Sequence, residues 1–279
     1  MSLFEDYEQA SLSYDEAGRK PVCVNKIIKK INPKSSLLDA GCGTGNYMRP
    51  LLESGKVSKY VAFDASEGML NQLKKKATLW QEDNKVDVII EVSQVSLMEP
   101  LPFENESFDV IIHNQVMHHI TINEGPDKFL HVREYLKEFY RVLKVGGKVL
   151  INNSTPQQHA VIWWVKNMPS SKKYFKNCGI SNEEFEELLL HVKLSNISFE
   201  IDSEPLLGEV YFNYEKFLSE KYQNADSGWS KGTLKEKKQL LDRLLECTQN
   251  IDVYQSFDKG VRDDLATFGQ TTMVFAIKN

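Results

Sequence analysis

The stretch that decides the fold reads Leu37-Leu38-Asp39-Ala40-Gly41-Cys42-Gly43-Thr44-Gly45-Asn46. The leucine pair follows a Lys-Ser-Ser turn and is typical of the apolar end of a short buried strand. The three glycines predict a sharp turn, and the residues from Tyr47 to Leu52 can start a helix. We therefore expect a strand, a glycine loop and a helix in succession.

A loop of this kind is suited to binding a ligand. Glycine adopts positive φ without strain, so a ligand can lie directly against the backbone and face the free amides of the following helix. Asp64 lies 23 residues after Gly41, at the end of a second apolar stretch, Tyr60 to Phe63. A carboxylate at the tip of a second strand can accept hydrogen bonds from both hydroxyls of a ribose. The ligand is thus expected to carry a nucleoside.

The glycine spacing separates two kinds of nucleoside ligand. Dinucleotide-binding folds use G-x-G-x-x-G, whereas this chain has glycines at 41, 43 and 45. Asp39, two residues before the first glycine, would repel a pyrophosphate but suits the ammonium of an amino acid. An NAD-dependent oxidoreductase is therefore the alternative that this spacing disfavours.

The motif of an apolar pair, an acid, any residue and G-x-G-x-G resembles that of the class I S-adenosylmethionine-dependent methyltransferases. The resemblance covers roughly residues 1 to 153 and rests on several motifs in the correct order. It implies a Rossmann-like, doubly wound α/β sheet of seven strands, mostly parallel with an antiparallel last strand. It also implies S-adenosyl-L-methionine as the cofactor and S-adenosyl-L-homocysteine as the product.

The resemblance also implies roles for individual residues. It places the amino-terminal Tyr and Arg near the methionine end of the cofactor, and the residue after the ribose acid beside the adenine. The residues that it assigns to the cofactor are Tyr14, Arg19, Asp39, Gly41, Cys42, Gly43, Asn46, Asp64, Ala65, Met69, Val95, Ser96, Asn114 and His119. One position departs from the family, because Ser96 stands where an acid usually binds the adenine amino group, and a neutral partner is weaker.

Composition narrows the class of protein. The chain has 279 residues, 41% of them hydrophobic, and a net charge of −5, so no global positive field would attract nucleic acid. It has no long apolar run and no signal-peptide pattern, so we expect a soluble, cytoplasmic protein without a membrane segment. Its four cysteines are scattered, which predicts free thiols and no zinc site.

The stretch from Ser107 to Ile112 is mainly apolar and predicts a fourth strand. Three histidines follow it, at positions 113, 118 and 119. No nearby Cys or acid completes a ligand set, so no metal is expected. His118 and His119 are the candidates for a general base, because imidazole titrates near neutrality. The alternative is that both are structural.

The second half is expected to complete one domain and to cover the site. We divide residues 1–279 into amino-terminal cap helices (1–33), a cofactor-binding core (34–153), helices and a sixth strand (154–207), a substrate lid insert (208–270) and a last strand (271–279). Within these we expect a helix over 127–143 that a Gly-Gly turn ends, and strand character over 197–207.

The insert between the last two strands is rich in aromatic residues. Trp163, Trp164, Tyr211 and Trp229 are candidates for the wall of an acceptor pocket that suits an amine or another cationic or planar compound. The alternative is that they form a small core of the insert itself.

The expected activity is transfer of a methyl group to a nitrogen or oxygen of a small-molecule acceptor by in-line displacement. Since the methyl group is already activated, the main task of such an enzyme is alignment and exclusion of water. The alternatives are an RNA or protein methyltransferase and a non-catalytic scaffold that binds the cofactor. The identity of the acceptor and the oligomeric state stay open.

Overall fold

The structure, a computed structural model, describes residues 7, 11, 14–84, 88–121, 127–223 and 226–279. The described residues form a seven-stranded sheet with the order β3-β2-β1-β4-β5-β7-β6. The strands are β1 (Ser35–Ala40), β2 (Val57–Asp64), β3 (Ile89–Gln94), β4 (Phe108–Asn114), β5 (Leu143–Asn153), β6 (Leu194–Asp202) and β7 (Thr271–Lys278). The pairs among β1 to β5 are parallel, and β7 is antiparallel to both neighbours. The predicted fold class and the antiparallel last strand are confirmed.

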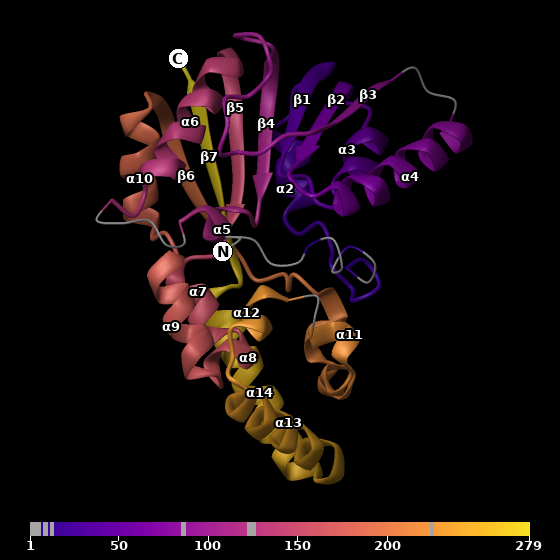
Figure 1. The fold of residues 1–279 in the computed structure, drawn as a ribbon, viewed down its shortest axis with the longest axis vertical. Coiled ribbons are helices and arrows are strands. Elements are labelled where there is room, and N and C mark those ends of the chain that lie inside the picture. Colours follow the sequence, from indigo (N-terminus) through magenta and orange to yellow (C-terminus); the bar gives the residue numbers. More distant parts are fainter. Residues whose placement is uncertain (1–6, 8–10, 12–13, 85–87, 122–126, 224–225) are drawn as a thin grey trace.

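Helices cover both faces of the sheet, as Figure 1 shows. One face is covered by α2 (Val24–Lys30), α3 (Met48–Glu53) and α4 (Glu67–Asn84), and the other by α6 (Leu130–Val142) and α10 (Asn182–His191). Leu37 and Leu38 of β1 point to opposite faces and are both fully buried. This burial on both sides explains why the central strands are almost continuously apolar.

Three predicted boundaries are corrected. The helix expected over 127–143 begins at Leu130, and its last residue is Val142. The residues from Lys144 to Gly147 belong to β5, which begins directly at Leu143, so they continue the chain as strand and do not form a separate turn. The strand expected over 197–207 is β6, which begins at Leu194 and ends at Asp202.

A second layer of helices lies beyond the carboxyl edge of the parallel strands (Figure 1). After β5 it contains α7 (Pro156–Val161), α8 (Trp163–Lys166) and α9 (Pro169–Cys178). The segment between β6 and β7 adds η1 (Gly208–Phe212), η2 (Tyr214–Leu218), α11 (Glu220–Gln223), α12 (Ser227–Ser230), α13 (Leu234–Gln249) and α14 (Ile251–Phe268). Both segments share one apolar core, so the helices after β5 and the insert are packed together.

Trp163 is the centre of this helical core. Its side chain is 1% exposed, its ring lies edge-on to those of Trp164, Tyr214 and Phe217, and its Nε1 donates to the carbonyl of Tyr211 at 3.0 Å. Such a ring removes a large apolar area from water and fixes several neighbours. The helical layer thus has a hydrophobic core of its own.

The amino-terminal segment is described only in part. The cap helices expected over 1–33 lie partly outside the described residues; residues 14–18 form a turn, and α2 begins at Val24. Asp15 accepts a hydrogen bond from Thr44 Oγ1 at 2.6 Å and pairs with Lys76 at 2.6 Å. These contacts hold the turn against the glycine loop.

In the described part of the chain, no helix has the length and apolarity required to cross a bilayer. The four cysteines are free and buried. Cys23 and Cys42 lie in the core on one face of the sheet, and Cys178 and Cys247 lie in the core of the helical layer.

The position of Trp163 predicts the effect of its removal. Trp163→Ala should lower the free energy of unfolding by about 3–5 kcal/mol, because it leaves a large cavity in the core of the helical layer. Urea denaturation followed by circular dichroism measures this change.

Leu234, which is 87% exposed on α13, provides the matched control. Leu234→Ala should change the stability by less than about 0.5 kcal/mol. Equal, small effects of both substitutions would contradict a packed core around Trp163.

Candidate functional site

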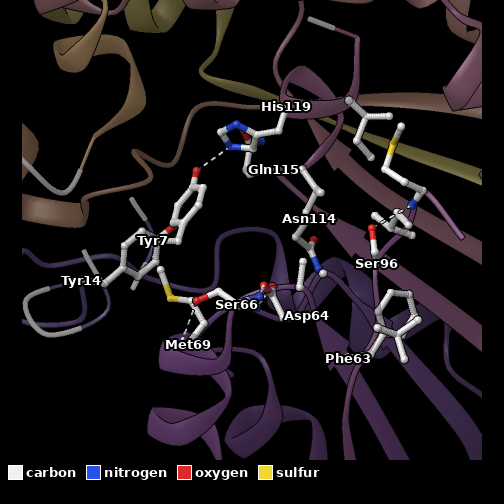
Figure 2. A pocket seen from close by; sticks show the side chains of 18 residues that line it. Tyr7, Tyr14, Phe63, Asp64, Ser66, Met69, Ser96, Asn114, Gln115 and His119 are labelled. Atoms are coloured by element: carbon white, nitrogen blue, oxygen red, sulfur yellow. Dashed lines mark hydrogen bonds between the residues drawn. The ribbon is translucent and has the colours of Figure 1, made fainter. Parts of the chain in front are cut away.

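A cavity of about 520 Å³ lies at the carboxyl edge of the parallel strands. Its wall is made by the ends of β1, β2 and β4, the start of α4 and the short helix α5 (Met117–Ile120) (Figure 2). Open α/β sheets bind ligands at this edge. The residues predicted for the cofactor that line the cavity are Tyr14, Gly41, Gly43, Asp64, Ala65, Met69, Val95, Ser96, Asn114 and His119.

The glycine loop leaves space for a ligand against its backbone. Gly41 and Gly43 have φ of 71° and 53°, a region that favours glycine. A Cβ on Gly41 would lie 2.7 Å from Val116 Cγ2, whereas a Cβ on Gly43 would meet no atom within 4 Å. A side chain at Gly43 would therefore occupy the space that the cavity keeps open.

Asp64 holds this loop in place. Its Oδ2 accepts the N–H of Gly43 at 2.9 Å, and its Oδ1 accepts the N–H of Ser66 at 3.0 Å. A carboxylate has about four lone-pair sites, which suffice to fix the loop and also to accept hydrogen bonds from a ribose. The geometry suits the role that the sequence predicted for this residue.

Asp39 lies beneath the loop and does not line the cavity. It is 1% exposed, and its Oδ2 accepts a hydrogen bond from Tyr60 Oη at 2.6 Å. Burial raises the pKa of its carboxyl to about 7; the hydrogen bond from Tyr60 opposes this rise, and the nearby charge of Asp64 adds to it. A cationic group bound above the loop would favour the ionised form.

Tyr7 and His119 meet at the opposite side of the cavity. Tyr7 Oη lies 2.6 Å from His119 Nε2, and the two rings are perpendicular (Figure 2). Burial, together with the nearby positive charges of Lys231 and Arg19, lowers the pKa of His119 to about 3. The imidazole is therefore neutral at pH 7 and shares a proton with a phenol at the cavity wall.

His118 lies behind His119 and outside the cavity lining. The two ring centroids are 3.9 Å apart, and His118 Nε2 lies 3.5 Å from Ser227 Oγ. Burial holds the pKa of His118 well below its usual value. Within the described residues, no group of His, Cys, Asp and Glu is arranged to hold a metal ion.

Three further residues predicted for the cofactor lie outside the lining. Arg19 Nη2 donates to Asp226 Oδ2 at 3.0 Å, which joins the amino-terminal segment to the insert. Asn46 Oδ1 accepts a hydrogen bond from Lys76 Nζ at 2.8 Å. The side chain of Cys42 is buried, with its Sγ 3.7 Å from the carbonyl of Gly43.

The predicted aromatic wall does not line the cavity either. All four side chains are at most 3% exposed, and all belong to the core of the helical layer. Their polar atoms are used within that layer, as in the bond from Trp164 Nε1 to Asp226 at 2.8 Å. The residues concerned are Trp163, Trp164, Tyr211 and Trp229.

The cavity also has lining residues that the sequence analysis did not assign, namely Tyr7, Phe63, Ser66, Leu97, Met98, Gln115, Val116 and Ile120. All except Tyr7 lie within two residues of an assigned position, so extending each motif by two residues would have found them. Tyr7 could not be found in this way, because it lies near no assigned motif and contacts His119, which is 112 residues away in the sequence.

Comparisons with known proteins agree with this geometry. Residues 38–151 match the profile of a family described as a methyltransferase domain. The chain is 34% identical over 159 residues to demethylmenaquinone methyltransferase from Bacillus cereus (strain ATCC 10987 / NRS 248), with 53% of this chain and 59% of the relative covered. It is 40% identical over 123 residues to the protein of the same name from Lactococcus lactis, with 43% of each covered.

A solved structure shows the same fold at low identity. Phosphoethanolamine N-methyltransferase 2 from Haemonchus contortus, in complex with S-adenosyl-L-methionine, is 16% identical with a TM-score of 0.55. The comparison covers 97% of this chain and 57% of that one. The chain thus spans about half the length of the relatives it matches.

The buried histidines make the stability dependent on pH. Burial lowers the pKa of His113 to about 4 and that of His159 to about 3, in addition to the effects on His118 and His119. Below pH 6.5 the imidazoles become protonated in the unfolded chain but stay neutral in the folded protein. Because the unfolded state then binds more protons, the free energy of unfolding falls as the pH falls toward 4. Asp39, with its raised pKa, acts in the opposite direction but accounts for one proton only.

We therefore expect the melting temperature to fall between pH 7.5 and pH 5, as measured by scanning calorimetry. His159→Leu should flatten this dependence by about one proton, or about 1.4 kcal/mol per pH unit. The exposed His191, replaced in the same way, is the control. A melting temperature that rises on acidification would contradict the assignment of neutral, buried imidazoles.

Proposed function

Because residues 38–151 form a methyltransferase domain of the class I S-adenosylmethionine-dependent type, we propose that this protein transfers a methyl group to a small-molecule acceptor. The observation that supports this most is one cavity bordered on one side by Asp64 and the glycine loop and on the other by Tyr7 and His119. The first set fits a cationic nucleoside cofactor, and the second supplies polar groups where an acceptor would bind.

The residues of the cavity suit S-adenosyl-L-methionine. Gly43 leaves its space open, Asp64 offers a carboxylate that could bind a ribose, and Asp39 lies buried beneath the loop, where a bound cation would favour its ionised form. When bound, this cofactor supplies a methyl group on a sulfonium and leaves as S-adenosyl-L-homocysteine. Exclusion of water by the surrounding apolar side chains would favour in-line transfer.

The second side of the cavity can accept the proton that leaves the acceptor. A nitrogen or oxygen that gains the methyl carbon through its lone pair then releases one proton. Tyr7 Oη can take this proton while its own proton passes to His119 Nε2, since the two atoms are 2.6 Å apart. His119 starts neutral and has a free lone pair, but because its pKa is lowered to about 3 it cannot keep a proton at neutral pH, so the pair passes the proton on and does not store it. These two residues are the catalytic pair of the proposal.

The charges around the cavity favour a neutral, planar acceptor. Lys231 and Arg19 oppose the protonation of His119, so this side of the cavity presents His119 as a neutral group. Leu97, Val116 and Ile120 provide apolar contact. The relatives from Bacillus cereus and Lactococcus lactis are named for demethylmenaquinone, and a compound with such a planar ring is the type of acceptor that we propose.

The first test is calorimetric titration of the protein with S-adenosyl-L-methionine and S-adenosyl-L-homocysteine, with NAD as the control. We expect micromolar binding of the first two and none of NAD. Asp64→Ala should weaken binding by about 10- to 100-fold, because hydrogen bonds to a charged group are each worth about 1.5–3 kcal/mol.

Glu91→Ala on the edge strand β3 is the matched control and should leave the affinity unchanged. Failure of the unmodified protein to bind either sulfur nucleoside would overturn the proposal. Binding without turnover of any acceptor, among phenols, amines, RNA and protein, would support the scaffold alternative.

The Tyr7–His119 pair gives a separate prediction. Tyr7→Phe retains the ring but removes the hydroxyl, so kcat should fall by about 10²- to 10⁴-fold while the affinity for the cofactor is unchanged. Transfer of radiolabelled methyl to the acceptor measures kcat. A weaker cofactor affinity with unchanged kcat would instead assign Tyr7 to cofactor binding.

A further inference from the structure

Asn114, at the end of β4, presents a carboxamide that is unused within the protein. Its Oδ1 and Nδ2 are both shielded from solvent, and neither has a hydrogen-bond partner among the described residues. Asn114 nevertheless lines the cavity, where Figure 2 shows it between Asp64 and Gln115. Unpaired buried polar atoms also occur elsewhere, for example His113 Nε2 and Asn152 Nδ2, but among the described residues that line the cavity Asn114 is the side chain with both polar ends buried and unpaired.

Other polar side chains that line the cavity have hydrogen-bond partners within the protein. Gln115 Nε2 donates to Asn152 Oδ1 at 2.8 Å, and Gln115 Oε1 accepts from Ser154 Oγ at 3.3 Å. Ser96 Oγ accepts the N–H of Met98 at 3.1 Å. These side chains are held by the protein, whereas both hydrogen-bonding ends of the Asn114 carboxamide are left for a ligand.

The backbone holds Asn114 in a fixed position. Asn114 pairs with Asn152 in the register of β4 and β5, and the next N–H, that of Gln115, bonds to the carbonyl of Asn152 at 2.8 Å. Gln115 has φ of 56°, which is strained for a residue other than glycine. Strain of this kind persists where the surrounding contacts impose it, often at functional sites.

The place of Asn114 along the sheet favours the acceptor as its partner. Strand β4 lies between β1, which carries the glycine loop, and β5, and it continues into α5 with His119. Asp64, Asp39 and the loop already provide for the ribose and for the charged end of the cofactor. Asn114 thus stands between the cofactor side and the Tyr7–His119 side of the cavity.

The resemblance to the methyltransferase family assigns Asn114 to the cofactor; we propose instead that Asn114 is a positioning residue that binds the acceptor by both ends of its carboxamide. A carboxamide offers one acceptor oxygen beside N–H donors, so its complement is an edge where an N–H or O–H adjoins a lone-pair atom. This defines the acceptor as a lactam, a catechol or an amino-heterocycle. The inference rests on the proposed function and specifies its substrate class.

The first arm of the test does not require the natural acceptor. Asn114→Leu has nearly the same shape but no hydrogen-bonding groups, so it should raise the melting temperature of the free protein by at least about 2 °C. Gln115→Leu is the matched control, and it should lower the melting temperature because it leaves Asn152 Oδ1 without its hydrogen bond.

The second arm uses 2-pyridone as the probe, titrated into protein saturated with S-adenosyl-L-homocysteine. The unmodified protein should bind 2-pyridone at least about tenfold more tightly than N-methyl-2-pyridone, which lacks the donor. Asn114→Leu should abolish this difference and leave the affinity for S-adenosyl-L-homocysteine unchanged within about threefold.

Each other result has a definite meaning. A tenfold loss of affinity for S-adenosyl-L-homocysteine in Asn114→Leu would make Asn114 a cofactor ligand and overturn the inference. A lower melting temperature, or no discrimination between the two pyridones by the unmodified protein, would also overturn it. Failure of the proposed function is distinct, since it would appear as absence of cofactor binding in the unmodified protein.

Discussion

The clamp between Asp64 and the glycine loop is the contact on which the site depends. The turn after β1 needs positive φ at Gly41 and Gly43, and such a turn has few internal hydrogen bonds to stabilise it. The neighbouring strand supplies them, because the carbonyl of Phe63 accepts the N–H of Gly41 and of Cys42, and Asp64 accepts that of Gly43. One carboxylate therefore shapes the backbone cradle and also faces the space in which a ribose would bind. Parallel pairing of β1 and β2 brings the two together.

The helical layer is tied to this edge through the amino-terminal segment. Asp15 bonds to Thr44 of the glycine loop, while Arg19, four residues later, pairs with Asp226 of the insert. Asp226 also accepts hydrogen bonds from Trp164 Nε1 and from the N–H of Trp229. The same short segment thus contacts the loop and the core of the helical layer. The amino-terminal segment therefore joins the glycine loop to the helical layer.

The sequence predicted the parts of the site that local chemistry defines. The glycine spacing, Asp64 and the residues after β2 and β4 follow from positions at strand ends, and ten of the fourteen residues assigned to the cofactor line the cavity. The fold class was predictable for the same reason, because buried strands and amphipathic helices have periodic patterns. The residues on the side of the cavity opposite the glycine loop were less predictable. Trp163 and Trp229 have the composition of a binding wall, yet the packing between α8, α12 and η2 buries them. Tyr7 joins His119 by a contact that no spacing encodes.

The two sides of the cavity differ in the charged groups that lie near them. Beneath the glycine loop lie Asp39 and, beside it, Asp64, and removal from water raises the pKa of Asp39 to about 7. Around His119 the nearby charges are those of Arg19 and Lys231, and the buried imidazole is neutral. Because Arg19 is itself paired with Asp226, the second side presents mainly the neutral imidazole. The aromatic faces of the insert, which would have suited a cationic acceptor, lie in its core. Recognition on the second side of the cavity would therefore depend on hydrogen bonds and shape and not on charge.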